Sequence, residues 1–273
     1  MNLRNELVKN LVSVVIPAFN CSNFIEEAVD SVLNQSYKNI EIIVIDDGST
    51  DNTLDIMRAF GNEIQIYSQE NNGISVARNL GILNSTGEYV AFLDADDKWK
   101  SDKLQKDLDF LNSGPFDYIV SPGFLWYENE LQLSFASVGK LERIEGLLEF
   151  CLSNPGYDPY LVSSMVIRRL SLSKTGLYNP EIREQGEAYD FHLRVLQHLS
   201  GIYRDEPSFF YRQHPASVSR KPKKNYFVNN RKAVNAMMDR NAISLAKKIK
   251  IRLKLEKSFI KSSIKDFYSN NLR

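Results

Sequence analysis

Two clusters of aspartates each follow directly after an apolar run of the sequence. Asp46 and Asp47 follow IEIIVI, and Asp94, Asp96 and Asp97 follow YVAFL. Carboxylate oxygens suit hard cations, and Mg²⁺ usually binds one or two carboxylates together with phosphate oxygens. Two such clusters on one edge of a sheet repel each other unless a cation lies between them. These residues therefore predict a metal-assisted diphosphate site.

The elements that must position these clusters are predicted by a regular alternation over the first part of the chain. Continuous β-branched runs predict buried strands, and apolar residues spaced three and four apart predict helices. Strands are predicted at 12–16, 40–45, 64–67 and 89–93, and helices at 23–33, 53–60, 75–83 and 101–111. The alternation predicts an α/β fold with a mostly parallel central sheet and helices on both faces. Ligands bind such sheets beyond the carboxyl ends of the strands, where both clusters would lie.

Local signals vary in strength along the chain. The first predicted helix has a capping-box pattern, with Asn23 at the N-cap and Glu26 three residues later. After Pro115 the periodicity fades. Candidate strands there are 118–120, 124–127, 131–135 and 163–168, and candidate helices are 144–151 and 189–199.

The composition limits the class of protein. Of 273 residues, 43% are hydrophobic and 25% are charged, which excludes wholesale disorder. No run approaches the roughly 20 apolar residues of a membrane-spanning helix, and the start of the chain lacks the cleavage site of a secretion signal. Cys21 and Cys151 are too few for a disulfide framework and lack the spacing of a zinc site. We therefore expect reduced thiols and a cytoplasmic protein.

The charges are unevenly distributed. The 34 basic and 34 acidic residues cancel over the whole chain, but residues 221–273 carry a net charge of +12 and residues 1–220 a net charge of −12. We expect a main domain at 1–220 and, after a hinge at 221–224, a basic helical extension at 221–273. Such a helix, with Lys and Arg opposite Ile, Leu and Phe, can lie on an anionic membrane. No nucleic-acid-binding motif accompanies the charge, so we expect no nucleic-acid partner.

Two common nucleotide-binding motifs are absent from the sequence. No G-x-G-x-x-G follows the first predicted strand, which argues against a dinucleotide-binding fold. No G-x-x-x-x-G-K-[ST] is present either, which argues against a P-loop.

Several ordered motifs resemble those of the family-2 glycosyltransferases. They are VSVVIPAFN, SVLNQSY, IEIIVIDDGSTDNT, NNGISVARNLGI and GEYVAFLDADD, and the resemblance resumes at GEAYDFHLR and YRQHPASVS. The resemblance implies the GT-A fold, which is Rossmann-like, and an inverting sugar transfer. It also implies that residues 1–115 bind the nucleotide and that residues 116–220 bind the acceptor.

The resemblance assigns roles to individual residues. Those lining the nucleotide pocket would be Pro17, Ala18, Phe19 and Asn20, with Phe19 against the base. Asp46 would accept a hydrogen bond from a uracil ring, and Arg78 would contact the nucleotide or its phosphate. In the D-x-D motif, Asp94 would face the ribose and Asp96 would bind a divalent metal, Mn²⁺ or Mg²⁺. The diphosphate would be covered by a loop containing Arg212, His214, Ser217 and Ser219.

The general base is assigned less uniquely. Glu187 stands at the position of the base, and Asp190, three residues later on the same helix face, is the alternative. Many family members have an acidic pair here, whereas this chain has Glu187 followed by Ala188. We interpret Asp97 as a loop residue and His192 as an ordinary helix residue.

The expected function is inverting, metal-dependent transfer of a sugar from a nucleoside diphosphate sugar, with UDP favoured, to an acceptor hydroxyl. The acceptor would be a saccharide or a lipid-linked saccharide, in the synthesis of a cell-surface polysaccharide or glycoconjugate. The transfer would be non-processive, because the Q-x-x-R-W motif of processive synthases is absent. The alternative is a transferase-like binding or scaffold protein that has lost catalysis, which the missing second acid after Glu187 motivates.

Overall fold

A seven-stranded sheet forms the centre of the computed structural model, which describes residues 7–127, 130–134, 147–153, 158, 160–183, 185–215, 217 and 224–240. Its strands, in spatial order, are β10 (Gly201–Tyr203), β6 (Tyr118–Val120), β9 (Val166–Arg168), β4 (Gly87–Phe92), β1 (Val8–Ala18), β2 (Ile40–Asp46) and β3 (Gln65–Ser68). Neighbouring strands run parallel except at β9, which is antiparallel to both β4 and β6. The predicted mostly parallel sheet is confirmed.

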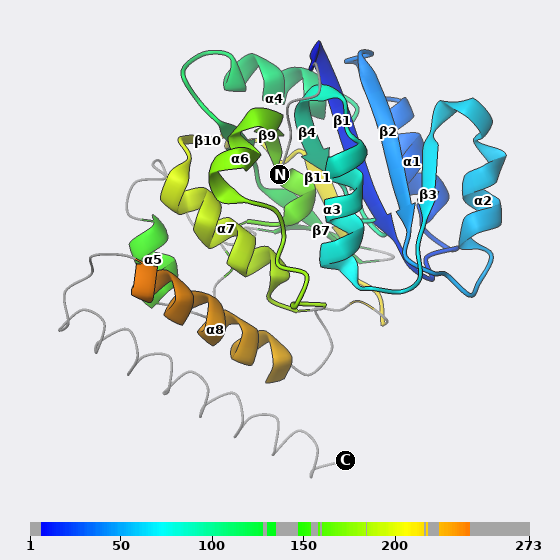
Figure 1. The fold of residues 1–273 in the computed structure, drawn as a ribbon. Coiled ribbons are helices and arrows are strands. Elements are labelled where there is room, and N and C mark those ends of the chain that lie inside the picture. Colours follow the sequence, from blue (N-terminus) through cyan, green and yellow to red (C-terminus); the bar gives the residue numbers. More distant parts are fainter. Residues whose placement is uncertain are drawn as a thin grey trace.

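Helices cover both faces of this sheet (Figure 1). They are α1 (Ile25–Leu33), α2 (Thr53–Ala59), α3 (Ile74–Asn84), α4 (Lys103–Leu111), α5 (Leu147–Ser153), α6 (Leu172–Thr175), α7 (Glu187–His198) and α8 (Lys224–Arg240), with 3-10 turns η1 (Gly61–Glu63), η2 (Val162–Ser164) and η3 (Arg169–Ser171). Alternate residues of β1 separate two cores. Val14 and Ile16 pack with α1, α2 and α4, whereas Val15 packs with α3, α6 and α7. Gly81 lets α3 approach β1 closely, because a Cβ there would lie 2.3 Å from a Val15 methyl carbon.

A second, four-stranded sheet lies beside the first. Its order is β5 (Lys98–Trp99), β11 (Phe209–Arg212), β7 (Gly123–Tyr127) and β8 (Glu130–Ser134). The sequence predicted β7 and β8 but not β5 or β11. β5 has two residues, too few to show an alternating pattern. This sheet connects the segment after the D-x-D motif to the segment that contains Arg212.

Two local predictions were wrong. Asn23 does not cap α1, because the N–H groups of Phe24 and Ile25 donate to the carbonyl of Cys21 and the helix begins at Ile25. The candidate strand 163–168 is a strand only at Val166–Arg168, and η2 occupies Val162–Ser164. Ser164 Oγ donates to the carbonyl of Leu161, a local bond that competes with strand pairing. The other predicted elements agree within a few residues, and 144–146 lie outside the described residues.

The helix α8 forms the start of the predicted basic extension and packs against α7. Val234 and Met238 are fully buried in the core that contains α7. Residues 221–223, most of the predicted hinge, and residues 241–273 lie outside the described residues. Among the helices that the structure describes, none is long and apolar enough to span a membrane.

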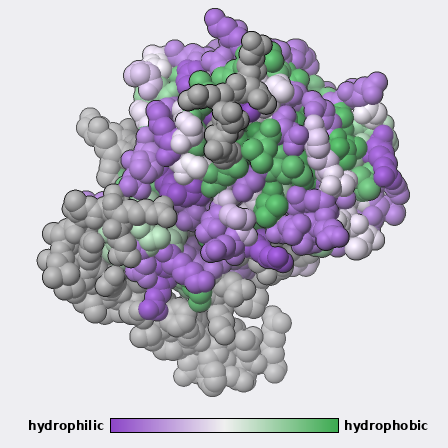
Figure 2. Space-filling view, viewed as in Figure 1, coloured by the Kyte–Doolittle hydropathy of each residue, from purple (hydrophilic) through white to green (hydrophobic). Residues whose placement is uncertain are grey.

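The face that carries α3, α6 and α7 is mostly hydrophilic, with hydrophobic residues gathered near its middle (Figure 2). Two large hydrophobic side chains are exposed on α3 and on the turn before α6. Leu83 of α3 is 49% exposed and Leu170 of η3 is 54% exposed.

Candidate active site

The loops after β1 and β2 are joined to each other beyond the carboxyl ends of the strands. The N–H of Asp47 donates to the carbonyl of Ala18 at 2.8 Å, and the N–H of Asn20 donates to Ser49 Oγ at 3.0 Å. Pro17 and Ala18 are buried at the end of β1, whereas Phe19 is 48% exposed. The ring of Phe19 is therefore accessible, and the family resemblance predicts that a nucleotide base packs against it.

The two aspartates after β2 have different surroundings. Asp46 is 3% exposed, and its Oδ1 accepts the N–H of Ser49 at 3.0 Å. Asp47 accepts hydrogen bonds from the N–H groups of Asn72 and Gly73, both at 2.9 Å. Asp47 thereby fixes the loop that leads into α3, a structural role that agrees with the turn chemistry of a DDGS segment.

Arg78 of α3 lies at the centre of the candidate site. It is 1% exposed, and its guanidinium donates to Asp94 Oδ1 at 2.7 Å and to Glu187 Oε1 at 3.1 Å. Burial opposes the charge of Arg78, but Asp94, Tyr178 and Glu187 outweigh that effect and hold its pKa above the usual value. Arg78 thus joins the first aspartate of the D-x-D motif to the candidate base.

The D-x-D loop also contacts β11 and the segment after it. Arg212 Nε donates to the carbonyl of Asp96 at 2.8 Å, and His214 Nε2 lies 3.0 Å from Asp96 Oδ2. Burial, and then the charge of Asp94, raise the pKa of Asp96, while His214 opposes the shift. The sequence predicted His214 near the diphosphate but not its contact with Asp96.

The donor set at Asp96 fits a divalent cation. A carboxylate and an imidazole nitrogen are both ligands that Mn²⁺ accepts, and diphosphate oxygens could complete the coordination. Within the described residues, no group of three or more His, Cys, Asp and Glu side chains is arranged to hold a metal. Asp96 Oδ2 and His214 Nε2 lie side by side and could hold a cation together with a bound diphosphate.

Asp97 is buried beside the motif, and each of its carboxylate oxygens accepts a hydrogen bond. Its carboxylate accepts the hydroxyl of Ser163 at 2.6 Å and the N–H of Arg212 at 3.0 Å. Burial, followed by the charges of Asp96 and Asp94, raises the pKa of Asp97 well above its usual value. These contacts agree with the interpretation of Asp97 as a loop residue.

The two candidate bases, Glu187 and Asp190, bind different arginines. Glu187 is the first residue of α7 and is 9% exposed. Asp190 Oδ2 accepts two hydrogen bonds from Arg194, at 2.7 and 3.2 Å. Both donors bind the same oxygen and tie Asp190 to its own helix, whereas Glu187 is connected through Arg78 to the D-x-D motif.

The predicted diphosphate loop is only partly described. Arg212 lies over the ring of Trp126, with its Cζ atom 3.8 Å from the ring centroid, and it is also paired with Glu27 of α1. The N–H of His214 donates to Ser217 Oγ at 3.1 Å. Ser219 lies outside the described residues.

Sequence reasoning missed two residues near the loop, Glu27 and Ser163. Glu27 also binds Lys98 Nζ at 2.6 Å, and Ser163 binds Asp97. Neither residue has a signal of its own in the sequence, because an acid in the first turn of a helix and a serine in a short turn are both common features.

Comparisons with known proteins identify the family of the chain. A family model described as Glycosyl transferase family 2 matches residues 13–169. The uncharacterized glycosyltransferase RP339 of Rickettsia prowazekii (strain Madrid E) is 41% identical over 204 residues, which cover 74% of this chain and 64% of that protein. Across five curated relatives, the chain spans between 33% and 64% of their length.

Two solved structures share the fold. S. aureus TarS 1-349 in complex with UDP-GlcNAc superposes with a TM-score of 0.68 at 17% identity, over 92% of this chain and 72% of that one. The mannosyltransferase PcManGT from Pyrobaculum calidifontis, in complex with GDP-Man and Mn²⁺, superposes with a TM-score of 0.62 at 16% identity, over 93% and 73%. The fold is thus GT-A-like, as the sequence predicted. Because the family model covers more than half of the residues, the chain belongs to glycosyl transferase family 2.

Proposed function

We propose that this chain transfers a sugar, with inversion, from a nucleoside diphosphate sugar to an acceptor hydroxyl. The observation that carries the proposal is the contact of Arg78 with both Asp94 and Glu187. The proposal is supported because Arg78 bridges Asp94, the proposed ribose contact, and Glu187, the proposed base, which lie almost a hundred residues apart in the sequence. An inverting transfer needs a base on one side of the sugar and a stabilised diphosphate on the other.

The donor is proposed to be a UDP-sugar. Phe19 would pack against the base, with Pro17, Ala18 and Asn20 around it, and Asp46 would accept the uracil N–H. Asp94 would face the ribose. The proposal is supported by a structural neighbour, TarS, which was solved with UDP-GlcNAc. Because another neighbour, PcManGT, was solved with GDP-Man, a GDP-sugar is the alternative donor.

A divalent metal is proposed to be held by Asp96 and His214. When bound, Mn²⁺ or Mg²⁺ would offset the negative charge that develops on the departing diphosphate. Arg212 binds Asp97 through its main-chain N–H and the Asp96 carbonyl through its side chain. These contacts would keep the segment that covers the diphosphate, including Ser217 and Ser219, against the D-x-D loop.

Glu187 is proposed as the base that accepts the proton of the acceptor hydroxyl. Arg78 holds its Oε1 in place. Asp190 is the alternative base, but its partner Arg194 lies on the same helix, whereas the partner of Glu187 also binds the D-x-D motif. The acceptor is proposed to be a saccharide or lipid-linked saccharide of a cell-surface polysaccharide or glycoconjugate, and the transfer to be non-processive.

The proposal is tested by calorimetric titration of UDP, GDP and dTDP with Mn²⁺ and with EDTA, followed by NMR of the transfer product. We expect one nucleotide to bind more tightly with Mn²⁺, and the new linkage to have the anomeric configuration opposite to that of the donor. Retention of configuration would exclude the inverting mechanism. Tight binding without donor hydrolysis or transfer in a broad acceptor screen would instead favour a binding or scaffold protein.

We also propose that the basic extension contacts an anionic membrane on its cytoplasmic side. Nine of its fifteen basic residues lie in 241–273, and Arg231 and Lys232 are exposed on α8. Each basic residue near such a surface contributes about 1 kcal/mol. Flotation with phosphatidylglycerol vesicles should recover the full chain but not a chain ending at residue 240, which keeps the buried helix α8. Equal flotation of both forms would contradict the membrane proposal.

A further inference from the structure

The hydroxyl of Ser163 connects two points of the D-x-D loop. Ser163 lies in η2 and is 1% exposed. Its Oγ accepts the N–H of Asp94 at 3.1 Å and donates to Asp97 Oδ2 at 2.6 Å. A single buried hydroxyl thus bonds both ends of the four-residue DADD segment.

The same segment is also held by Arg212 of β11. Asp97 Oδ1 accepts the N–H of Arg212, and Arg212 Nε donates to the carbonyl of Asp96. Asp97 is only 1% exposed, and a buried carboxylate is costly without hydrogen-bond donors, so it depends on the Ser163 hydroxyl and the Arg212 N–H. Removing either donor should therefore change the shape of the segment as well as its stability.

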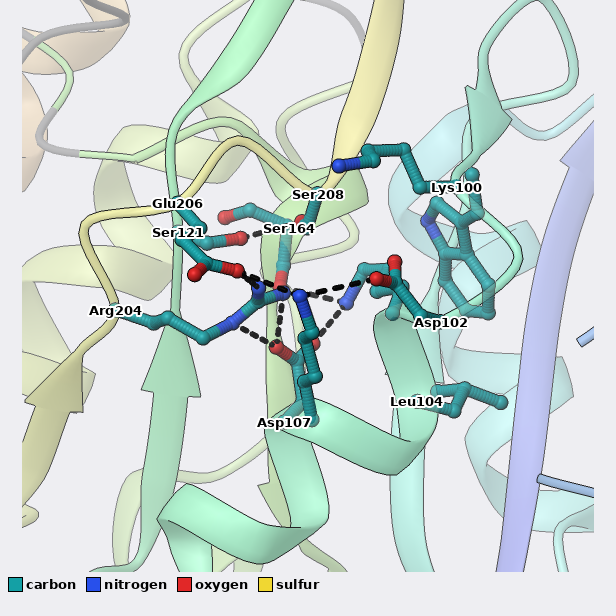
Figure 3. Close-up of polar contacts among 12 residues, drawn as sticks. Lys100, Asp102, Leu104, Asp107, Ser121, Ser164, Arg204, Glu206 and Ser208 are labelled. Atoms are coloured by element: carbon teal, nitrogen blue, oxygen red, sulfur yellow. Dashed lines mark hydrogen bonds and ion pairs between the residues drawn. The ribbon is translucent and has the colours of Figure 1, made fainter. Parts of the chain in front are cut away.

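The turn that carries Ser163 rests on a buried network of charges (Figure 3). Trp99 Nε1 donates to the carbonyl of Ser163 at 2.8 Å, and Lys103 Nζ donates to the carbonyl of Ser164 at 3.1 Å. Lys103 and Arg204 both bind the fully buried carboxylate of Asp107, at 2.5 and 2.9 Å. The main chain of η2 is thus fixed independently of the Ser163 hydroxyl.

We propose that Ser163 is a positioning residue for the D-x-D loop. By binding Asp94 N–H and Asp97 together, it keeps the intervening Asp96 carboxylate in the orientation that receives a metal-bound diphosphate. The proposal rests on the proposed function, because it assigns Asp96 to the metal.

The neighbouring serine provides a matched control. Ser164 belongs to the same turn and is also fully buried, but its hydroxyl donates to the carbonyl of Leu161 within the turn. Ser163→Ala and Ser164→Ala remove the same atom from adjacent buried sites. Only the first removes contacts with the D-x-D loop.

The test measures, in the full chain, how much Mn²⁺ increases the affinity for a nucleotide. UDP, GDP and dTDP are titrated with Mn²⁺ and with EDTA, and the ratio of the two Kd values is measured for wild type and both variants. We expect Ser163→Ala to reduce that ratio at least tenfold, whereas Ser164→Ala changes it less than twofold. A loss of fold stability alone would not change the ratio selectively.

If Ser163→Ala does not fold, Ser163→Cys keeps the buried volume while supplying only a weak hydrogen-bonding group, and it should also reduce the ratio. An unchanged ratio in the folded Ser163 variant, or an equal loss in Ser164→Ala, would overturn this proposal alone. A wild-type chain that binds none of the three nucleotides would overturn the proposed function and this proposal together.

Discussion

Arg78 shows how much of the candidate site depends on one side chain. Its buried guanidinium binds Asp94 and Glu187, and its Cζ atom lies 5.2 Å from the ring centroid of Tyr178. The two acids come from different segments and would repel each other without the guanidinium that both of them bind. The arginine therefore serves both the stability of the fold and the geometry of the site.

Replacing Arg78 with Met should destabilise the protein by about 3–5 kcal/mol, because two acids lose a buried partner. Urea unfolding measures the change. Arg58→Met is the control, because its side chain is 64% exposed and its partner Asp55 is 77% exposed. Similar losses for the two variants would contradict the role assigned to Arg78.

Glu187→Gln should lower kcat by about a hundredfold or more, which is typical for loss of a general base. Its nucleotide affinity should stay within about twofold of wild type, because the base contacts the acceptor and not the diphosphate. Steady-state kinetics and calorimetry measure the two quantities. Asp190→Asn should weaken the contact with Arg194 and leave kcat within a few-fold. A larger loss of kcat in Asp190→Asn would identify Asp190 as the base.

The sequence predicted the positions of the site residues better than their contacts. Asp46, Asp94 and Asp96 follow strands that end at one edge of the sheet, so strand prediction alone located them. The pairing of Arg78 with Glu187 was not predictable, because it depends on the packing of α3 against the start of α7. Ser163 gave no signal, because its role comes entirely from tertiary contacts.

At the scale of elements, α8 supports the segment that precedes Glu187. Asn229 Nδ2 donates to the carbonyl of Gln185 at 2.8 Å. Gly186 has φ 98°, and a Cβ there would lie 2.7 Å from Asn230 Oδ1. The start of the basic extension therefore helps to set the start of α7. Charge patterning predicted the extension, but it could not show that α8 belongs to the core.

Met238→Ala should cost about 2–4 kcal/mol of stability, as expected for a fully buried methionine. Lys232→Ala, on the exposed side of the same helix, should change stability by less than about 0.5 kcal/mol. Thermal or urea unfolding of the full chain measures both variants. If Met238→Ala is as stable as wild type, α8 does not pack as described.

At the scale of the whole molecule, the two cysteines report on the integrity of both cores. Cys21 packs with α1 and Cys151 with α7, and both are buried. Burial raises the pKa of Cys21 to about 12, against the hydrogen bond from Thr53. Burial also raises the pKa of Cys151.

Neither thiol should therefore react with a disulfide reagent at pH 8 in the native protein, because reaction requires the thiolate. Both should react after unfolding in urea. The absorbance of the thiolate released from the reagent measures how many thiols react in each state. Rapid reaction of one thiol per chain in the native protein would contradict the described packing.

Metal-dependent sugar transfer is measured by nucleotide release from UDP-, GDP- and dTDP-sugars, with and without Mn²⁺, for wild type and Asp96→Asn. We expect wild type to release nucleotide from one donor class only when Mn²⁺ is present. Asp96→Asn should unfold at nearly the wild-type temperature and release almost none, because the carboxylate is proposed to bind the ion and is not part of the apolar core. No release from any donor, or release by Asp96→Asn at the wild-type rate, would contradict metal-dependent transfer at Asp96.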